Sequence, residues 1–407
     1  MASLNLNGVD KVYLSGATAL HDISFEAEDR EFIVIVGGEK CGKTTLLKVI
    51  AGLEEPTSGT VAIDGKDMAE VDTKDRDIAM VFRQDPLNPN FTVFDNLAFG
   101  LRQRKAPEAL IEQRVKVVAN ILGLNEALYR KPKVLSAAER QRIAIGRAMV
   151  REPRLYLFDE PLAGIDENLR RDTLNVIINV QARMNGTFVY ATKSLSEALT
   201  IGTRLVILKD GLVQQIDTPS NLYDYPANTY VAFYIGSPTI NFLQNAKIVK
   251  EGEGYFAEFN GGRLALAENI VNRFEKIDEY AGTDKKIIIG IRPEDICASA
   301  DGTLCAKLVK TQSNGESAYA ECDIGGQFVK VTYGTQGANG AEVKLAADVT
   351  KLYIFDSETR LTLLKRDGGY KNTGHKDADR IPLPYPEEQA VIEKLKPKKE
   401  DTKKKLR

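Results

Sequence analysis

The stretch "GGEKCGKT", residues 37–44, decides how the first part of this chain folds. It matches the pattern of a glycine, four residues of any type, a second glycine, a lysine and a serine or threonine. The apolar run "EFIVIV" (31–36) before it indicates a buried strand, and "TTLLKVIAGL" (44–53) indicates a helix. Strand, glycine loop and helix together predict a phosphate-binding loop, because N–H groups at a helix start attract anions. A chance glycine turn is the alternative.

This motif predicts that the loop binds the phosphates of a nucleotide together with Mg²⁺. We expect Lys43 to reach the β and γ oxygens of the nucleotide and the Thr44 hydroxyl to hold Mg²⁺. The nucleotide-binding residues expected here are Gly37, Gly38, Glu39, Lys40, Cys41, Gly42, Lys43, Thr44 and Thr45.

A second motif, "LYLFDEP" (155–161), supports the first. Four apolar residues precede Asp159 and Glu160, which places two carboxylates at the end of a buried strand, where ligands of an open sheet bind. Asp159 suits the Mg²⁺ shell, and Glu160 suits a base that polarises the attacking water. A structural ion pair is the alternative for two adjacent acids.

The length of 407 residues predicts two or three domains. Residues 1–235 alternate apolar strands with helical patterns, which predicts an α/β domain with a mostly parallel sheet and a helical subdomain at about 86–150. Residues 236–365 contain short strands broken by turn residues, which predicts a small all-β barrel. Residues 366–407 predict a disordered, basic tail that is either solvated or in contact with anionic lipid.

Composition excludes several classes of protein. The formal net charge is −2, so we expect no nucleic-acid partner. No apolar run reaches the roughly 18 residues that a transmembrane helix needs, and no signal peptide is recognisable, which predicts a cytoplasmic protein. Four cysteines without a CxxC pair predict buried, reduced thiols.

With these motifs the chain resembles the ATP-binding subunits of ATP-binding-cassette (ABC) importers, of the carbohydrate-importer, MalK-like type. The resemblance covers residues 4–365. It implies a P-loop ABC ATPase domain followed by an oligonucleotide-binding-like regulatory barrel. The segments that carry it, besides the two motifs above, are "DRDIAMVF" (75–82), "LSAAERQR" (135–142), "DEPLAGID" (159–166) and "GIRPED" (290–295).

The resemblance also implies further nucleotide contacts. Tyr13 matches an aromatic residue that stacks on adenine, although a surface or strand tyrosine is the alternative. Two subunits of such proteins stack head to tail, so that Ser136, Ala137 and Ala138 of one subunit lie over the γ-phosphate held by the other. Asp166 matches an aspartate at that dimer interface.

Two departures from the family pattern concern the catalytic positions. Arg83 stands where the family has a glutamine that contacts Mg²⁺ and water, with Gln84 one residue late, and Lys193 stands where it has a switch histidine. Both add positive charge, which favours holding ATP. Neither readily orients a water or carries a proton, and loss of such a group typically costs about 10²- to 10⁴-fold in rate.

The segment 135–142, which in such dimers closes over the nucleotide of the other subunit, and the phosphate loop also depart from the family pattern. Ala137 and Ala138 replace two glycines, whose backbone freedom and close approach a Cβ obstructs. Glu139 then sets a negative charge near the polyphosphate; the alternative is tolerated drift, with Glu139 turned into solvent. Residues 38–40 read Gly, Glu, Lys where the family usually has Pro, Ser, Gly, and Lys40 either strains the turn or adds a cation.

We therefore expect an importer subunit at the cytoplasmic face of the membrane that binds ATP and hydrolyses it weakly. Its expected partners are two permease subunits, a second ABC ATPase in a homodimer or, preferentially, a heterodimer, and indirectly an extracytoplasmic solute-binding protein. In a heterodimer both composite sites would still be impaired. Apolar candidates for the permease contact are Phe91, Phe94 and Phe99, with packing inside the helical subdomain as the alternative. A non-catalytic nucleotide-sensing scaffold and an ordinary active ATPase remain rival functions, and only the resemblance favours carbohydrate over polyamine or iron.

Overall fold

Strand β3 (Phe32–Val36), which leads into the phosphate loop, is buried along its whole length inside a six-stranded sheet. The computed structural model describes residues 3–83, 86–313, 318–332 and 340–366. The sheet order is β10-β9-β3-β8-β7-β6; its first pair is antiparallel and the other four pairs are parallel. The other strands of this sheet are β6 (Ile78–Val81), β7 (Leu155–Asp159), β8 (Thr187–Thr192), β9 (Arg204–Lys209) and β10 (Leu212–Asp217).

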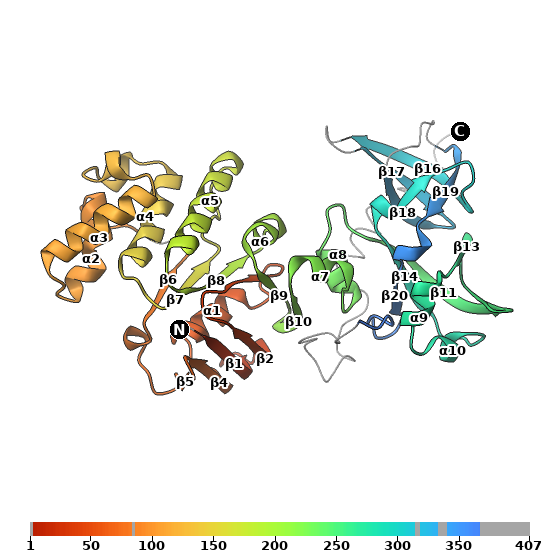
Figure 1. The fold of residues 1–407 in the computed structure, drawn as a ribbon, viewed down its shortest axis with the longest axis horizontal. Coiled ribbons are helices and arrows are strands. Elements are labelled where there is room, and N and C mark those ends of the chain that lie inside the picture. The colour runs from red at the N-terminus through yellow and green to blue at the C-terminus, as the bar shows by residue number, and fades with distance from the viewer. Residues whose placement is uncertain (1–2, 84–85, 314–317, 333–339, 367–407) are drawn as a thin grey trace, which may run out of the picture. The chain divides into compact units, whose positions relative to one another are not determined.

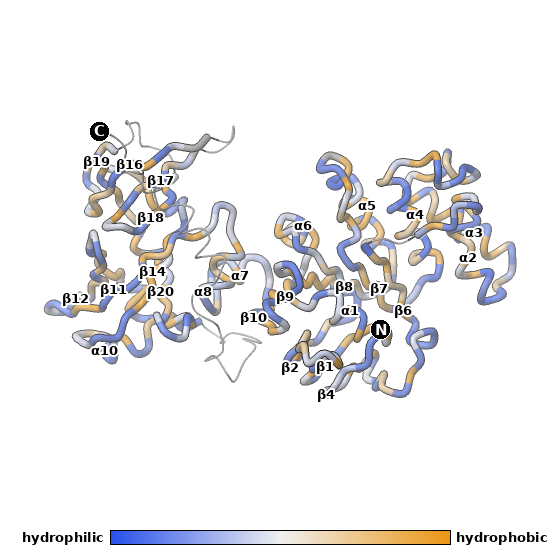
Figure 2. The backbone as a smooth tube through the Cα atoms, turned by 180° about the vertical axis from the view of Figure 1, so that it is seen from behind, coloured by the Kyte–Doolittle hydropathy of each residue, from blue (hydrophilic) through white to orange (hydrophobic). Residues whose placement is uncertain are grey.

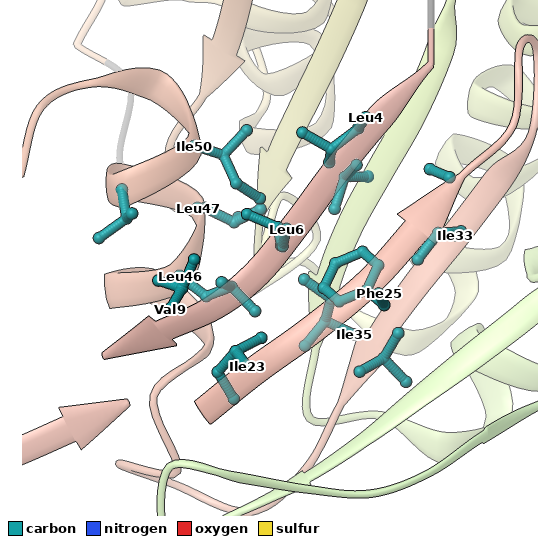
Figure 3. Packing of buried hydrophobic residues seen from close by; sticks show 14 of the residues in the cluster. Leu4, Leu6, Val9, Ile23, Phe25, Ile33, Ile35, Leu46, Leu47 and Ile50 are labelled. Carbon is teal, nitrogen blue, oxygen red and sulfur yellow. The ribbon is translucent and has the colours of Figure 1, made fainter. Parts of the chain in front are cut away.

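A second, antiparallel sheet lies in the same unit and was not predicted. Its order is β2-β1-β4-β5. Side chains of its first two strands pack against β3 and the first helix, as Figure 3 shows for Leu6, Phe25, Ile35 and Leu47. The helix that begins at Lys43 is packed against the sheet by this core. The strands are β1 (Leu4–Val12), β2 (Thr18–Ala27), β4 (Ser58–Ile63) and β5 (Lys66–Asp67).

The predicted helical subdomain is present, since residues 86–150 contain no strand. Its three α-helices pack on one another and form one group in Figure 1. The helices of the first unit are α1 (Lys43–Ala51), α2 (Val93–Gln103), α3 (Glu108–Ile121), α4 (Ala137–Val150), α5 (Glu167–Arg183), α6 (Leu195–Ile201) and α7 (Pro219–Asp224).

The chain divides into two compact units between Asp224 and Tyr225. Helix α8 (Thr229–Tyr234), which lies before residue 236, therefore belongs to the second unit. The reason is local packing, because Ala232 is buried with Ile240, Ile288 and Phe355. Gln84 and residues 367–407 of the expected tail lie outside the described residues.

After α8, the second unit contains a five-stranded antiparallel sheet in the order β13-β12-β11-β14-β20. Strand β14 (Ile287–Ile291), which lies between β11 and β20, is buried throughout and is one of the hydrophobic segments in Figure 2. The remaining strands and helices are β11 (Asn241–Glu251), β12 (Gly254–Phe259), β13 (Gly262–Ala265), α9 (Glu268–Arg273), α10 (Ile277–Tyr280) and β20 (Tyr353–Asp356).

The predicted barrel is closed, in the order β15-β18-β17-β16-β19. Its strands are β15 (Ile296–Ala298), β16 (Leu304–Ser313), β17 (Ala318–Ile324), β18 (Gln327–Thr332) and β19 (Glu342–Ala347). The expectation of four buried thiols is wrong for two of them. Cys41 and Cys322 are buried, whereas Cys297 and Cys305 are exposed, because they alternate along β15 and β16 with the inward-facing Ile296 and Leu304.

Arg292, from the segment "GIRPED", closes the end of α8 and is only 1% exposed. Its guanidinium donates to the backbone oxygens of Ala232 at 2.9 Å and Ile235 at 2.7 Å, and it lies over the ring of Tyr353 at 5.2 Å. We expect Arg292→Met to lower the stability of the second unit by about 2–3 kcal/mol, because two carbonyls would lose a charged donor. Urea unfolding followed by circular dichroism would measure this, and an unchanged midpoint would contradict it.

Candidate nucleotide-binding site

The phosphate loop, residues 37–42, joins β3 to α1 through a backbone path that requires glycine at two positions. Gly42, at the N-terminus of α1, has φ 107°, and a Cβ there would lie 2.6 Å from the Ala19 carbonyl oxygen. A Cβ on Gly37 would lie 2.1 Å from the Leu208 oxygen. Lys40 has φ 61°, a left-handed conformation that costs a non-glycine residue roughly 1–2 kcal/mol. The loop therefore keeps its shape at a small cost in strain.

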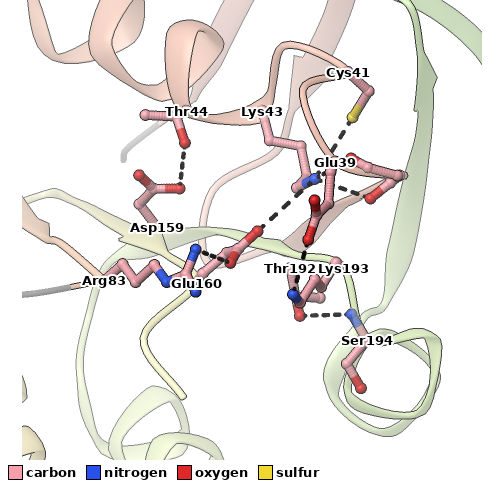
Figure 4. Close-up of polar contacts among 12 residues, drawn as sticks. Glu39, Cys41, Lys43, Thr44, Arg83, Asp159, Glu160, Thr192, Lys193 and Ser194 are labelled. Carbon is pink, nitrogen blue, oxygen red and sulfur yellow. Dashed lines mark hydrogen bonds and ion pairs between the residues drawn. The ribbon is translucent and has the colours of Figure 1, made fainter. Parts of the chain in front are cut away.

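Lys43 is the first residue of α1 and is 5% exposed. Its ammonium donates to the backbone oxygens of Gly37 at 2.9 Å and Gly38 at 2.7 Å, and it lies 3.6 Å from the Cys41 sulfur. The loop's own carbonyls therefore hold the cation in place, as Figure 4 shows. Such a buried ammonium can exchange these carbonyls for phosphate oxygens.

Thr44 and Asp159 meet although they are far apart in the sequence. The Thr44 hydroxyl donates to the Asp159 carboxylate at 2.9 Å. Burial raises the pKa of Asp159 above its ordinary value, and the Thr44 hydrogen bond opposes that rise only in part. A nearby divalent cation would offset this burial penalty. The pair of hard oxygen donors fits Mg²⁺, which typically takes one or two protein groups together with phosphates and waters.

Glu160 lies between two cations, as Figure 4 shows. One of its oxygens is 4.0 Å from the Lys43 ammonium, and the other is 3.6 Å from the Arg83 guanidinium. Glu160 also has φ 44°, and residues held in such sparsely populated conformations cluster at functional sites. Arg83, expected to face the nucleotide, thus pairs with the predicted base. The pair is weak, because Arg83 is 60% exposed.

Lys193 follows β8 and has an acidic partner in the phosphate loop. Its ammonium lies 3.3 Å from the Glu39 carboxylate, and both side chains are exposed. The sequence placed Lys193 and Glu39 separately in the site, at two positions that differ from the family. The structure brings them together, so the positive charge added by Lys193 is partly offset in the chain itself.

Ser136 is the N-cap residue of helix α4 and forms a capping box with Glu139. The Ser136 hydroxyl accepts from the Glu139 N–H at 3.2 Å, while the Glu139 carboxylate accepts from the Ser136 N–H and hydroxyl, both at 2.8 Å. Glu139 is therefore engaged in its own helix turn instead of pointing freely into solvent or standing as an unpartnered charge. The pattern of serine followed three residues later by glutamate could have indicated this in the sequence.

We expect Glu139→Ala to reduce the stability of the first unit by about 0.5–1 kcal/mol at neutral pH, because the helix start loses its acceptor. The Ser136 N–H and hydroxyl lower the pKa of the Glu139 carboxyl. The folded chain therefore gains stability above the unfolded-state pKa and loses it as pH falls through the folded-state pKa. Urea midpoints of parent and variant should differ at pH 7 and converge near pH 3; an equal difference at both would contradict this.

The remaining predicted residues divide into two groups. The Tyr13 hydroxyl lies 3.2 Å from the Thr45 hydroxyl, so Tyr13 adjoins the phosphate loop. Ser136 and Asp166, by contrast, lie immediately before helices α4 and α5 and are exposed. Among the described residues neither forms a hydrogen bond or ion pair with the phosphate loop. Ala137 is exposed beside Ser136, and Ala138 is buried.

The comparison of the sequence with protein families gave two matches. Residues 20–163 match the ABC transporter family, and residues 236–296 match the MalK OB fold domain. The first segment contains the phosphate loop, Asp159 and Glu160. The second lies in the unit that contains the closed barrel.

Curated relatives match along most of the chain. The oligosaccharide import ATP-binding protein MsmX of Bacillus subtilis is 39% identical over 375 residues, covering 89% of this chain and 100% of its own length. The trehalose/maltose import ATP-binding protein MalK of Thermococcus litoralis is also 39% identical, covering 88% and 99%. The solved structure of CbiO1 from Clostridium perfringens, part of an ABC transporter complex, is 25% identical with a TM-score of 0.52, covering 55% and 90%.

Proposed function

The chain belongs to the ABC transporter family of ATP-binding proteins, and from this premise we propose that it is the ATP-binding subunit of a carbohydrate importer. The observation that carries the proposal is the meeting of the Lys43 loop with Thr44, Asp159 and Glu160. Similarity along most of the chain to relatives named for oligosaccharide and for trehalose/maltose import supports the substrate class.

In the proposed function, the loop binds the phosphates of ATP at the N-terminus of α1. N–H groups at a helix start attract anions, and Lys43 exchanges its carbonyl partners for the β and γ oxygens. Tyr13, which follows β1 and adjoins Thr45, would pack on the adenine. Glu160 would polarise the water that attacks the γ-phosphorus.

Thr44 and Asp159 would hold Mg²⁺. The metal, when bound, neutralises charge on the β- and γ-phosphate oxygens. Among the described residues no group of three or more His, Cys, Asp or Glu side chains forms a metal cage, which is consistent with a cation held mainly by nucleotide and water.

We further propose that hydrolysis by the isolated chain is slow. Arg83 pairs with Glu160, so the proposed base has a guanidinium beside it at the position where the family has a glutamine amide that orients the water. Lys193 pairs with Glu39 and offers an ammonium where the family has an imidazole. The Ser136 N–H and hydroxyl, which would otherwise donate to a γ-phosphate, already donate to Glu139. Each of these three contacts engages a residue that would otherwise act on the water or the γ-phosphate, whereas the phosphate-binding residues Lys43 and Thr44 are unchanged from the family pattern.

The helical subdomain offers a surface for permease subunits. Phe91 and Phe99 have ring centroids 6.0 Å apart, Phe94 stacks with Tyr129 at 6.4 Å, and Phe99 is 47% exposed. Each pair joins a half-buried ring, Phe91 or Phe94, to an exposed one, Phe99 or Tyr129, and exposed apolar rings favour a binding surface over core packing. No helix among the described residues is long and apolar enough to cross a bilayer. We therefore place the chain peripherally, at the cytoplasmic face of the membrane, on two permease subunits that receive solute from a binding protein.

The altered closing residues favour pairing with an intact paralogous ATPase over a homodimer. In a homodimer both sites would combine Arg83 and Lys193 of one subunit with Ser136, Ala137 and Ala138 of the other. In a heterodimer each site would contain one family-like half. Co-purification with tagged permeases and both ATPases would decide this, and a stable, transport-competent homodimer would contradict it.

Radiolabelled ATP and the purified full-length chain test the nucleotide part of the proposal. We expect Mg²⁺-dependent ATP binding with slow release of phosphate. Absence of nucleotide binding would contradict the proposal and favour a scaffold, and brisk turnover would contradict the slow step. The substrate class requires reconstitution with the permeases, where uptake of labelled oligosaccharide is expected.

A further inference from the structure

Glu197, in α6, is a buried carboxylate for which no role was predicted from the sequence. It is only 6% exposed. One oxygen accepts from the Thr192 hydroxyl at 2.7 Å and from the Tyr190 hydroxyl at 2.9 Å, both from β8. Burial and the neighbouring Glu197 raise the pKa of Tyr190 well above its ordinary value, so its hydroxyl stays protonated and donates. A buried acid in so small a helix needs an explanation other than packing, since an apolar side chain would fill the space at less cost.

The partners of Glu197 flank Lys193 on both sides. The Thr192 hydroxyl, which donates to Glu197, also accepts from the Ser194 N–H at 3.0 Å (Figure 4). The Ser194 hydroxyl in turn accepts from the Glu197 N–H at 3.4 Å. The residues immediately before and after Lys193 are therefore tied to one carboxylate residue. The position of the Lys193 backbone depends on this arrangement.

A second element reaches the same carboxylate. Arg170 of α5 has its Nε 3.8 Å from the other Glu197 oxygen, and another of its nitrogens donates to the Ile165 backbone oxygen at 3.1 Å. Ile165 immediately precedes Asp166, the residue expected at the dimer interface. A continuous chain of contacts thus links the segment before α5 to the Lys193 loop through Arg170 and Glu197.

We propose that Glu197 is a positioning residue that fixes the Lys193 loop relative to the Ile165–Asp166 segment, so that displacement of one is transmitted to the other. The inference rests on the proposed function for its consequence, which is placement of Lys193 at the nucleotide. Its structural basis is two hydroxyl donors and one guanidinium that converge on one buried carboxylate. Energetic coupling between sites requires such contiguous contacts, and an experiment must demonstrate it.

Two threonines of the same strand provide a matched test. Thr192 and Thr187 are both buried in β8, but Thr187 binds the backbone of Glu28 and Arg30 at the other end of the strand. Thr192→Val and Thr187→Val should each lower the melting temperature by about 2–4 °C. Because Lys193 supplies positive charge that favours holding ATP, only Thr192→Val and Glu197→Gln should weaken ATP binding, by roughly threefold to tenfold. Equal losses in both threonine variants, or unchanged ATP affinity in Glu197→Gln, would overturn the proposal.

Amide hydrogen exchange measures the coupling between the Lys193 loop and the Ile165–Asp166 segment in the absence of nucleotide. It therefore tests this inference separately from the proposed function. In Glu197→Gln we expect faster exchange in residues 192–195 and also in 163–168, whereas Thr187→Val should leave both segments unchanged. The double variant Arg170→Gln, Glu197→Gln should exchange no faster in 163–168 than either single variant. Exchange that changes at 192–195 alone, or additive effects, would overturn the link. If the full-length chain does not bind ATP, the proposed function is contradicted. The exchange experiment, which needs no nucleotide, still tests the link between the two segments.

Discussion

The double variant Arg83→Gln, Lys193→His is expected to hydrolyse ATP on the order of a hundredfold faster than the parent chain. Arg83 holds its guanidinium 3.6 Å from Glu160, and Lys193 holds its ammonium 3.3 Å from Glu39. An amide at residue 83 can both donate to and accept from a water. An imidazole at residue 193 can carry a proton near neutral pH, which an ammonium cannot readily do. The change therefore restores positioning groups while Lys43, Thr44, Asp159 and Glu160 stay in place.

Matched variants separate chemistry from charge. Arg83→Lys and Lys193→Arg retain the positive charge and should leave turnover near the parent rate. Adding Ala137→Gly and Ala138→Gly should raise it further if dimer closure is also limiting, because glycine allows the backbone to approach phosphate closely. Steady-state phosphate release under saturating ATP measures these effects. A parent chain as fast as the double variant would show that neither substitution impairs catalysis.

Lys43→Met is expected to weaken ATP binding by about a hundredfold or more. Charge-assisted hydrogen bonds are typically worth about 1.5–3 kcal/mol each, and Lys43 has two carbonyl partners that phosphate oxygens would replace. The Lys43 ammonium is buried at the start of α1, so its position is fixed, unlike that of a flexible surface lysine. Equilibrium dialysis with labelled ATP would measure the dissociation constant.

Lys48→Met is the control for that loss. Lys48 lies in the last turn of the same helix, so its removal should change stability slightly and ATP affinity little. Retention of tight ATP binding by Lys43→Met would mean that the loop backbone alone grips the phosphates. Equal losses in both lysine variants would indicate damage to α1 instead of loss of a phosphate contact.

The grip on phosphate could be predicted from the sequence because its residues are contiguous. The glycines, Lys43 and Thr44 occupy fixed positions between a buried strand and a helix, and local backbone geometry requires that order. The division into an α/β ATPase unit and a later barrel was also readable, since apolar spacing differs between the two. The antiparallel sheet of β1, β2, β4 and β5 escaped prediction; its two hairpins are local, but the pairing of β1 with β4 that joins them connects segments far apart in sequence.

The sequence by itself determined that this chain has a nucleotide loop, a pair of strand-end acids and unusual residues at Arg83, Lys193 and Glu139. Only the tertiary structure decided what Arg83 and Lys193 contact, whereas the Ser136–Glu139 capping box is local in the sequence. Arg83 contacts Glu160, and Lys193 contacts Glu39. The Lys193 loop is linked through Thr192 and Glu197 to Arg170. These contacts form because parallel strands bring their loops together at one sheet edge. Residue type and spacing specify local conformation, whereas the partner of a charge depends on which distant segments the fold places within reach.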